Sequence, residues 1–593
     1  MVMDRHIACL QPADRSRGHL KKGKFMYAKL HAIPHYSQTH RLKGTFIAML
    51  RTCSLALVCL FTLPTLGQEA TSATANLMKQ AEAAYEAKHF RESAGFYIRA
   101  LPLVQDNDRA GVEYNLACSQ ALAGDRASAF DSLDHAVEDG YTDRKDTEAD
   151  KDLVSLHTDP RWQPLLERMT NFTAQQDARW GDAAFATPNA TNIADVDKLA
   201  GLAELWAQAK FGFANFWHVP QLNWDQTYRD FIPKVLATRS TEDYYRVLQS
   251  FYALLQDGHS NVYSPELIEG KLSRLPLRTR LVDGHLLVIG SRDPSANLQG
   301  LHAGDEIITI NSEPATSWAE RNVAPFVSAS SSQDRNTRTY EYVPFLAPIG
   351  TTFTLGVETT SGKQSTHVFE VMKSASQHSP LFDLKFLPGN IAYVALNGFD
   401  DNTAAKEWDK HWPQISKADS LILDLRKNGG GSDAVGAHIM ATLIDKTALG
   451  ELSRSTRWIA TYRAWGNAET PLRFPVGTVE PDPARHFSGP TVLLISPRTY
   501  SAGEDMVVVF AQAHRGKTIG EPTGGSTGQP LMFKLPGGGG ARVCTKHDSF
   551  ADDREFVGVG IQPDIPAHST RSDIIAGRDS VLETAIHSLQ TKP

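Results

Sequence analysis

Residues 380–590 alternate short apolar strands with helices, and this alternation constrains the fold more than any other feature of the chain. The runs "NIAYVAL" (390–396) and "SLILDLRKNGGG" (420–431) are typical of buried strands, and "DAVGAHIMATLI" (433–444) is typical of a helix. Strands that alternate with helices predict an α/β domain around a largely buried sheet. The glycine run after the second strand lets the backbone turn sharply and point its N–H groups outward, as an anion site requires.

The stretch "TYSAGEDM" (499–506) places Ser501 between a predicted strand and a predicted helix. The strand is "GPTVLLIS" (489–496), and the helix follows over 503–516. Serine is a favoured N-cap, so a purely structural role is one interpretation. The other is a nucleophile whose oxyanion would form beside the positive end of a helix.

Composition limits the partners. The chain has 593 residues, of which 41% are hydrophobic, which is enough for three or four globular domains. Its 60 basic and 67 acidic residues give a net charge of −7 without long charge runs, which argues against nucleic acid or an anionic membrane surface as the main partner. No HExxH motif or carboxylate–histidine cluster has metal-ligand spacing, so we expect no metal and disfavour a metal hydrolase.

The N-terminal region has the features of a leader over residues 1–67. In "LRTCSLALVCLFTLPTLGQEA" (50–70), a basic residue precedes an apolar core of signal-peptide length that ends near Gly67. We therefore predict a signal peptide at about 49–67, an exported (periplasmic or secreted) protein that begins near Gln68, and an over-extended gene start over 1–48. A membrane anchor is the alternative if the signal is not cleaved. Export leaves only Cys118 and Cys544, which predicts no structural disulfide.

Three further regions are expected between the leader and the α/β domain. Residues 72–170 are helical and self-similar; "AYEAKHFRESAGFYIRAL" (84–101) and "ACSQALAGDRASAFDSLDHAV" (117–137) resemble a tetratricopeptide pair, which implies a groove for a protein partner, although a simple helical cap is an equal alternative. Residues 193–265 form a helical segment rich in aromatic residues. Residues 270–375 are β-rich, and "GLHAGDEIITINSEP" (300–314) resembles part of a PDZ domain, a peptide-binding fold; a β-rich linker without a ligand is the alternative.

Four motifs in order along the chain carry a stronger resemblance. "LILDLRKNGGG", "RTYSAGEDM", "KTIGEPTGGSTGQ" and "FVGVGIQPDI" resemble the catalytic domain of tail-specific, or C-terminal processing, serine peptidases, which include the tricorn core. The resemblance covers about 195–590. It implies a crotonase-like α/β core, a PDZ-like domain, no cofactor, and endopeptidase activity on C-terminal or unfolded segments of proteins.

The resemblance assigns the catalytic groups. Ser501 becomes the nucleophile, the N–H of Ala502 one oxyanion donor, and the N–H of Gly430 or Gly431 the other. A serine hydroxyl needs a base within hydrogen-bond reach. The lysine that some members use is absent from "GEPTGGSTGQ" (520–529), so we expect the tricorn-like alternative, a histidine from the helical segment.

His259, in "LLQDGHSNVY", is that expected base. It predicts a pH–rate profile that rises through a pKa of roughly 6 to 7. If His259 is not the base, a lysine such as Lys517 or Lys534 has to be considered.

Two further members of the site are carried over less directly. The tricorn-like arrangement adds a serine beside the histidine and a glutamate before the "GxxPD" turn, which suggests Ser260 and Glu555 here. Ser260 lies on the C-terminal side of the histidine, and Glu555 could equally be a solvated charge. Glu504 is close to Ser501, but the helix dipole favours a carboxylate in the first turn whatever the chemistry. A competing function is a non-catalytic scaffold that binds peptides or hydrophobic ligands on the same fold.

Overall fold

The computed structural model describes residues 66–104, 106–373 and 379–590. Apart from its last two residues, the predicted leader therefore lies outside the described chain. Two compact units divide the described chain between Gly181 and Asp182, and each is described by itself.

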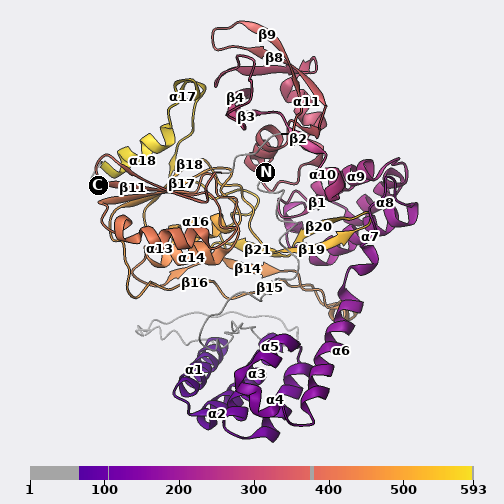
Figure 1. Ribbon diagram of the computed structural model, residues 1–593, viewed down its shortest axis with the longest axis vertical. Coiled ribbons are helices and arrows are strands. Elements are labelled where there is room, and N and C mark those ends of the chain that lie inside the picture. Colours follow the sequence, from indigo (N-terminus) through magenta and orange to yellow (C-terminus); the bar gives the residue numbers. More distant parts are fainter. Residues whose placement is uncertain (1–65, 105, 374–378, 591–593) are drawn as a thin grey trace, which may run out of the picture. The chain divides into compact units, whose positions relative to one another are not determined.

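The N-terminal unit is entirely helical (Figure 1). Helix α1 packs against α2, and α3 packs against α4, so the unit contains two helical hairpins. Alanines on facing helices, such as Ala117 and Ala129, are fully buried and let the helices of the second pair approach closely. Asp125 caps α4 through the backbone N–H of Ser128. The helices are α1 (Leu66–Glu86), α2 (Phe90–Ala100), α3 (Asp106–Leu122), α4 (Arg126–Glu138), α5 (Arg144–Ala149) and α6 (Trp162–Trp180).

The second unit begins with three helices that pack on a small sheet. Their aromatic residues, including Phe251 and Tyr252, form a core with apolar residues of the sheet such as Val543. Strand β1 follows the last of these helices and pairs with β20. This pairing places the loop between the helix and β1 next to residues that are far away in the sequence. These elements are α7 (Asp195–Gly212), α8 (Trp224–Leu236), α9 (Thr241–Ala253), β1 (Asn261–Tyr263), β19 (Pro530–Leu535) and β20 (Gly539–Cys544).

A β-rich domain follows, as the sequence predicts. Its main sheet has the order β3-β4-β5-β8-β9, with antiparallel neighbours. Alternate residues of β8, such as Phe353, Leu355 and Val357, are buried in the domain core. The elements are β3 (Leu277–Val282), β4 (His285–Ser291), β5 (Glu306–Ile310), β8 (Thr352–Glu358), β9 (Gln364–Glu370), α11 (Ala315–Asn322) and α12 (Ser332–Thr337).

The C-terminal part of the unit is an α/β layer structure around a six-stranded sheet of order β10-β11-β12-β17-β18-β22. Strand β10 is antiparallel to its neighbour, and the remaining pairs are parallel. The strands are β10 (Phe382–Leu387), β11 (Ile391–Leu396), β12 (Ser420–Asp424), β17 (Thr491–Ile495), β18 (Lys517–Gly520) and β22 (Ile565–Pro566).

Helices cover both faces of this sheet (Figure 1). In β12, Leu421 and Leu423 pack with one set of helices, while Ile422 points to the opposite face, which is covered by the last helix. Because both faces are buried, the strands are continuously apolar rather than alternating. The helices of the first face are α13 (Thr403–Ile415), α14 (Asp433–Ala441) and α16 (Ala502–Gln512), and that of the second is α18 (Ser580–Gln590).

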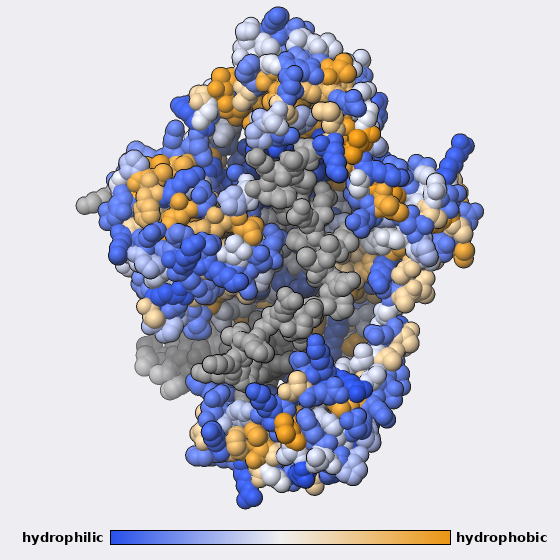
Figure 2. All heavy atoms as spheres, viewed as in Figure 1, coloured by the Kyte–Doolittle hydropathy of each residue, from blue (hydrophilic) through white to orange (hydrophobic). Residues whose placement is uncertain are grey.

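No helix among the described residues is long and apolar enough to span a bilayer. The face drawn in Figure 2 carries its hydrophobic residues in separate patches among hydrophilic ones.

Candidate active site

Ser501 stands at the turn between β17 and α16 in a backbone conformation that is rare for a residue with a side chain. Its φ of 53° and ψ of −131° are strained values, which are characteristic of functional turns. Although Ser501 occupies the N-cap position of α16, its side chain makes no capping hydrogen bond. Its Oγ lies instead 3.1 Å from Nε2 of His259. The capping interpretation therefore fails on geometry, and the hydroxyl is directed at a base.

His259 reaches this position from the loop between α9 and β1, and it is buried. Its second ring nitrogen, Nδ1, lies 2.8 Å from Oγ of Ser526. The ring stacks on Tyr500, with centroids 5.2 Å apart. Burial is the main reason that the pKa of His259 is well below 6.5, and the nearby cations Arg542, Arg338 and Lys546 lower it further. The imidazole is thus neutral at pH 7, so a rise of activity between pH 6 and 7 would not report the titration of His259.

The loop that carries Ser526 is fastened to the first turn of α16 by Glu504. This carboxylate is fully buried and accepts hydrogen bonds from the hydroxyl of Thr523 (2.5 Å) and from the N–H groups of Gly525 and Ser526 (2.8 Å each). Desolvation raises its pKa to about 7, and the hydrogen bonds oppose that rise. The helix dipole alone does not explain Glu504, because the carboxylate is bound to the loop that contacts the histidine.

Two backbone N–H groups beside Ser501 are available to a ligand. The glycine turn after β12 has φ values of 97° at Gly430 and 128° at Gly431, which require glycine. A Cβ on Gly430 would lie 2.5 Å from Cβ of Ser501, so this turn packs directly against the serine. The N–H of Gly430 donates to Oδ1 of Asn428 (2.9 Å). Within the described chain, no acceptor is recorded for the N–H of Gly431 or that of Ala502.

The structure does not bring Ser260 to the imidazole. Its hydroxyl donates to Oδ1 of Asp257 (3.0 Å) and accepts the N–H of Cys544 (3.1 Å). The same carboxylate oxygen of Asp257 accepts the backbone N–H of His259 (2.9 Å). Ser260 and Asp257 thus hold the backbone of the histidine loop rather than its ring.

Glu555 also lies apart from the Ser501–His259 contact. Its carboxylate is 42% exposed and lies 2.8 Å from Nε2 of His547. His547 in turn contacts Asn215, whose amide donates to Asp257. Any influence of Glu555 on His259 must therefore pass through three intervening side chains.

The two alternative lysines are not candidates for the base. Lys517 and Lys534 are both more than 60% exposed and lie 3.5 and 4.0 Å from Asp564 and Asp182. Each ammonium is thus paired with a surface carboxylate, and no contact of either with Ser501 is recorded among the described residues.

Residues 390–567 match the family model described as peptidase family S41. The chain therefore contains a peptidase family S41 domain. The carboxyl-terminal-processing protease of Picosynechococcus sp. is 24% identical over 377 residues, which cover 61% of this chain and 80% of that protein. The chloroplastic C-terminal processing peptidase of Tetradesmus obliquus is 26% identical over 177 residues, or 30% of this chain and 34% of that protein. The structure of mature CPAF complexed with lactacystin shares the fold, with a TM-score of 0.55, 14% identity, and coverage of 67% of this chain and 98% of that one.

With this S41 domain, the chain is a serine peptidase that also has a helical N-terminal region and β-rich parts. Sequence reasoning gave no role to two residues that contact His259, Ser526 and Asp257. The resemblance places Ser526 or its neighbours in "GEPTGGSTGQ" where some members of the family use a lysine, and that position was the signal for Ser526. Asp257 lies two residues before His259, in a spacing typical of a carboxylate that accepts a local backbone N–H.

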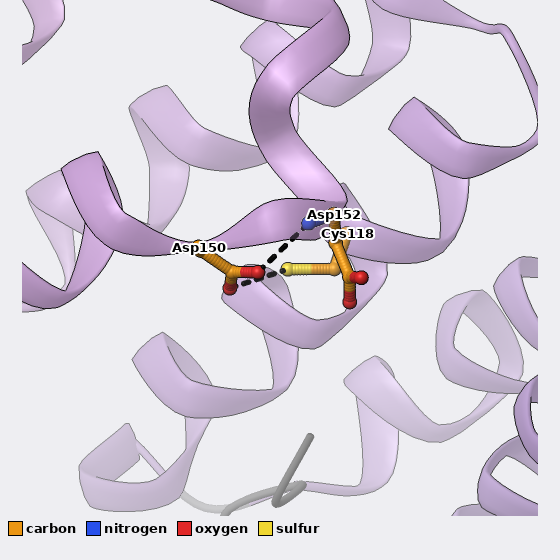
Figure 3. A group of neighbouring side chains, drawn as sticks. All are labelled: Cys118, Asp150 and Asp152. Carbon is orange, nitrogen blue, oxygen red and sulfur yellow. Dashed lines mark hydrogen bonds between the residues drawn. The ribbon is translucent and has the colours of Figure 1, made fainter. Parts of the chain in front are cut away.

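A group in the N-terminal unit has the composition of a metal site. Cys118, Asp150 and Asp152 have potential ligand atoms within 4.8 Å of one another (Figure 3). Asp150 accepts hydrogen bonds from Tyr114 (2.8 Å) and Cys118, and Asp152 accepts one from Tyr85. These hydrogen bonds already satisfy the carboxylates, so the group is explained by packing of the helices. Cys118 and Cys544 are both buried free thiols.

Proposed function

We propose that this chain is an exported serine endopeptidase in which Ser501 is the nucleophile and His259 the general base. The contact of 3.1 Å between Oγ of Ser501 and Nε2 of His259, at a strained turn before a helix, carries this assignment. In the reaction, Oγ attacks the scissile carbonyl carbon while Nε2 takes its proton. The imidazolium then returns the proton to the leaving amine, and water repeats the cycle on the acyl-enzyme.

Ser526 supplies the partner for the other side of the imidazole. For Nε2 to accept a proton, the neutral ring must carry its hydrogen on Nδ1, and Oγ of Ser526 is 2.8 Å from that nitrogen. Ser526 accepts this hydrogen and so selects the productive tautomer. Glu504 acts one step further away, because its carboxylate holds the N–H groups of Gly525 and Ser526. We assign both as positioning residues.

The N–H groups of Gly431 and Ala502 form the proposed oxyanion hole. Gly430 is the less suitable of the two glycines, since its N–H already donates to Asn428. Ala502 is the first residue of α16, whose positive end adds to the stabilisation of the oxyanion. Removing one such donor costs about 100- to 1,000-fold in rate in other serine peptidases.

The remaining features describe how substrates would be selected. The β-rich domain contacts both catalytic loops: Ser330 accepts the N–H of Gly258 (3.0 Å), and Ser331 donates to the carbonyl of Gly524 (2.7 Å). These contacts support a PDZ-like domain that presents C-terminal or unfolded segments to a crotonase-like core of the tricorn type. The paired helices of the N-terminal unit support a tetratricopeptide-like region that binds a protein partner. No cofactor is part of the proposal.

A fluorophosphonate probe tests this function against the alternative of a non-catalytic scaffold. We expect stoichiometric labelling of Ser501 in the wild-type protein, none in Ser501→Ala, and much slower labelling in His259→Ala. Ser549→Ala is the matched control, because Ser549 is buried in the same unit but lies on β21 (Lys546–Ser549). Absence of labelling of the folded wild-type protein at every pH would favour the scaffold.

A further inference from the structure

The imidazole of His259 has to carry a positive charge during the proposed reaction, and its surroundings oppose that charge. The ring becomes an imidazolium when Nε2 takes the proton of Ser501. Burial is the largest cause that lowers the pKa of this histidine, and three nearby cations, Arg542, Arg338 and Lys546, lower it further. The reaction therefore needs a group that stabilises the imidazolium once it has formed.

Among the described residues, no carboxylate is recorded in contact with the imidazole ring. Nδ1 lies 2.8 Å from the hydroxyl of Ser526, which is a neutral partner. Asp257 is close in sequence, but its Oδ1 accepts the backbone N–H of His259 (2.9 Å) and its Oδ2 accepts the amide of Asn215 (3.0 Å). In a Ser-His-Asp triad the aspartate contacts the ring and stabilises the imidazolium directly. Here that contribution has to come from another kind of group.

Tyr500, the residue before the nucleophile, lies against the ring of His259. The two ring centroids are 5.2 Å apart and the ring planes are inclined by 17°, so the imidazole faces the electron-rich face of the phenol. Burial raises the pKa of Tyr500 well above its usual value of 10, so the side chain is a neutral phenol. A cation within about 6 Å of an aromatic centroid is attracted by the ring quadrupole, most strongly where water is excluded. An imidazolium at this position would lie within that range.

The loops around Tyr500 hold its ring in place. A Cβ on Gly258, in the histidine loop, would overlap the hydroxyl of Tyr500, and a Cβ on Gly524, in the loop of Ser526, would overlap its Cδ2. The backbone N–H of Tyr500 donates to the carbonyl of Asn428 (3.0 Å), at the start of the glycine turn. The phenol ring is thus already placed beside the imidazole before the charge develops, which is the condition for electrostatic stabilisation of a transition state.

A second cation lies near the same aromatic ring. The guanidinium carbon of Arg338 is 5.1 Å from the centroid of Tyr500. Its charge is paired with the buried carboxylate of Asp334, with 2.7 Å between Nε and Oδ1. Because this close ion pair carries no net charge, it leaves the electron density of the Tyr500 ring available to the imidazolium.

We propose that Tyr500 stabilises the imidazolium of His259 through a cation–π interaction, in place of a carboxylate. The inference rests on the proposed peptidase function, and it makes Tyr500 a positioning residue that acts on the reaction through His259. In the step concerned, the O–H bond of Ser501 breaks, its proton moves to Nε2, and Oγ forms a bond to the carbonyl carbon. The interaction is strong only while the ring is charged, so it should raise kcat and leave KM unchanged.

The test lowers the electron density of the ring while keeping its shape. Position 500 of the full chain receives phenylalanine, or phenylalanines with one, two or three ring fluorines, and cleavage of a fluorescently labelled unfolded protein gives kcat and KM. Tyr500→Phe should stay within about threefold of the wild type, because no hydrogen-bond partner of normal geometry is recorded for the buried hydroxyl among the described residues. With added fluorines kcat should fall stepwise, by about tenfold in total, at constant KM. Tyr500→Leu, which removes the aromatic face, should lose at least as much.

The same fluorinated residues at position 510 are the matched control. Phe510 is fully buried on α16, and no contact between it and His259 is recorded. Thermal melts of both series separate a loss of packing from a loss of charge stabilisation. We expect kcat to stay constant along the series at position 510.

Three outcomes would overturn the inference. Equal kcat along the fluorine series at position 500 would leave Tyr500 with a packing role only. A loss in Tyr500→Phe as large as that in Tyr500→Leu would assign the effect to the hydroxyl. Parallel losses of kcat at positions 500 and 510 would show that the fluorines act on packing. The proposed function fails separately, if the wild-type protein shows no Ser501-dependent cleavage.

Discussion

Two glutamates near catalytic motifs differ in almost every physical respect. Glu504 is fully buried and accepts three hydrogen bonds from the loop that carries Ser526. Glu555 is 42% exposed and contacts His547 and, more distantly, Arg454. A buried carboxylate with several donors fixes its surroundings, whereas an exposed one is screened by water. The comparison indicates that Glu504, in the helix after Ser501, is the carboxylate that holds the loop beside His259.

The largest effect is expected at the proposed catalytic pair, Ser501 and His259. The comparison of the two glutamates assumes that this pair acts as one unit. Ser501→Ala should lower kcat/KM on an unfolded protein by about four to six orders of magnitude, with little change in melting temperature. His259→Ala should cost nearly as much, and the double variant no more than either, since the two groups act in a single step. Steady-state kinetics with matched thermal melts check this. Additive losses would contradict the pair, because they would mean that each residue acts without the other.

Glu504→Gln comes next in magnitude. The amide has the same shape, but its NH₂ group faces backbone donors in place of an accepting oxygen. We expect kcat to fall about 10- to 100-fold with KM nearly unchanged. Steady-state kinetics measure both constants, and urea unfolding checks that the variant is folded at the assay pH. Full activity in Glu504→Gln would mean that Glu504 is not the carboxylate that serves the site.

The pH dependence separates Glu504 from His259. The pKa of Glu504 is raised to about 7 by burial, with a smaller contribution from Asp334, while that of His259 is lowered well below 6.5. The ionised carboxylate is the form that accepts the loop's hydrogen bonds, so kcat/KM of the wild type should rise with an apparent pKa near 7. In Glu504→Gln this acid limb should move to lower pH.

The contribution of Glu504 to the free energy of unfolding should change with pH in the opposite direction to kcat/KM. The folded state keeps the proton of Glu504 up to about pH 7 and the unfolded state only to about 4.5, so this group's contribution to stability decreases as pH rises between these values. A wild-type acid limb that is identical in Glu504→Gln would assign it to another group.

Sequence reasoning reached the parts of this site that local pattern determines. The apolar strands, the helix after Ser501 and the glycine turn at Gly430 and Gly431 follow from periodicity and residue type, and His259 followed from the missing lysine. It could not place Ser526 on Nδ1 of His259, because these residues are 267 positions apart and are joined only by tertiary structure. Glu555 was chosen because it lies shortly before the "GxxPD" turn in the sequence. In the structure its carboxylate contacts His547 instead of His259.

Ser526→Ala should have a smaller effect than the change at Glu504. Losing the hydroxyl removes the partner of Nδ1 but leaves the loop anchored, so we expect kcat to fall about tenfold. Ser526→Thr should restore part of the rate. Thr527→Ala, which removes the neighbouring hydroxyl bound to Asp505, is the matched control for loop stability. A loss in Thr527→Ala equal to that in Ser526→Ala would mean that the loop, rather than the Ser526 hydroxyl, matters.

The smallest effect is expected at Glu555. Glu555→Gln keeps an acceptor for His547, and Nδ1 of that histidine remains 2.9 Å from Oδ1 of Asn215. Since exposed ion pairs contribute about 1 kcal/mol or less, we expect less than a threefold change in kcat/KM and a shift in melting temperature of only a few degrees. The same assay should be run on Glu504→Gln at equal protein concentration. A hundredfold loss in Glu555→Gln with unchanged stability would show that the path through His547, Asn215 and Asp257 reaches the histidine loop, and that Glu555 rather than Glu504 completes the site.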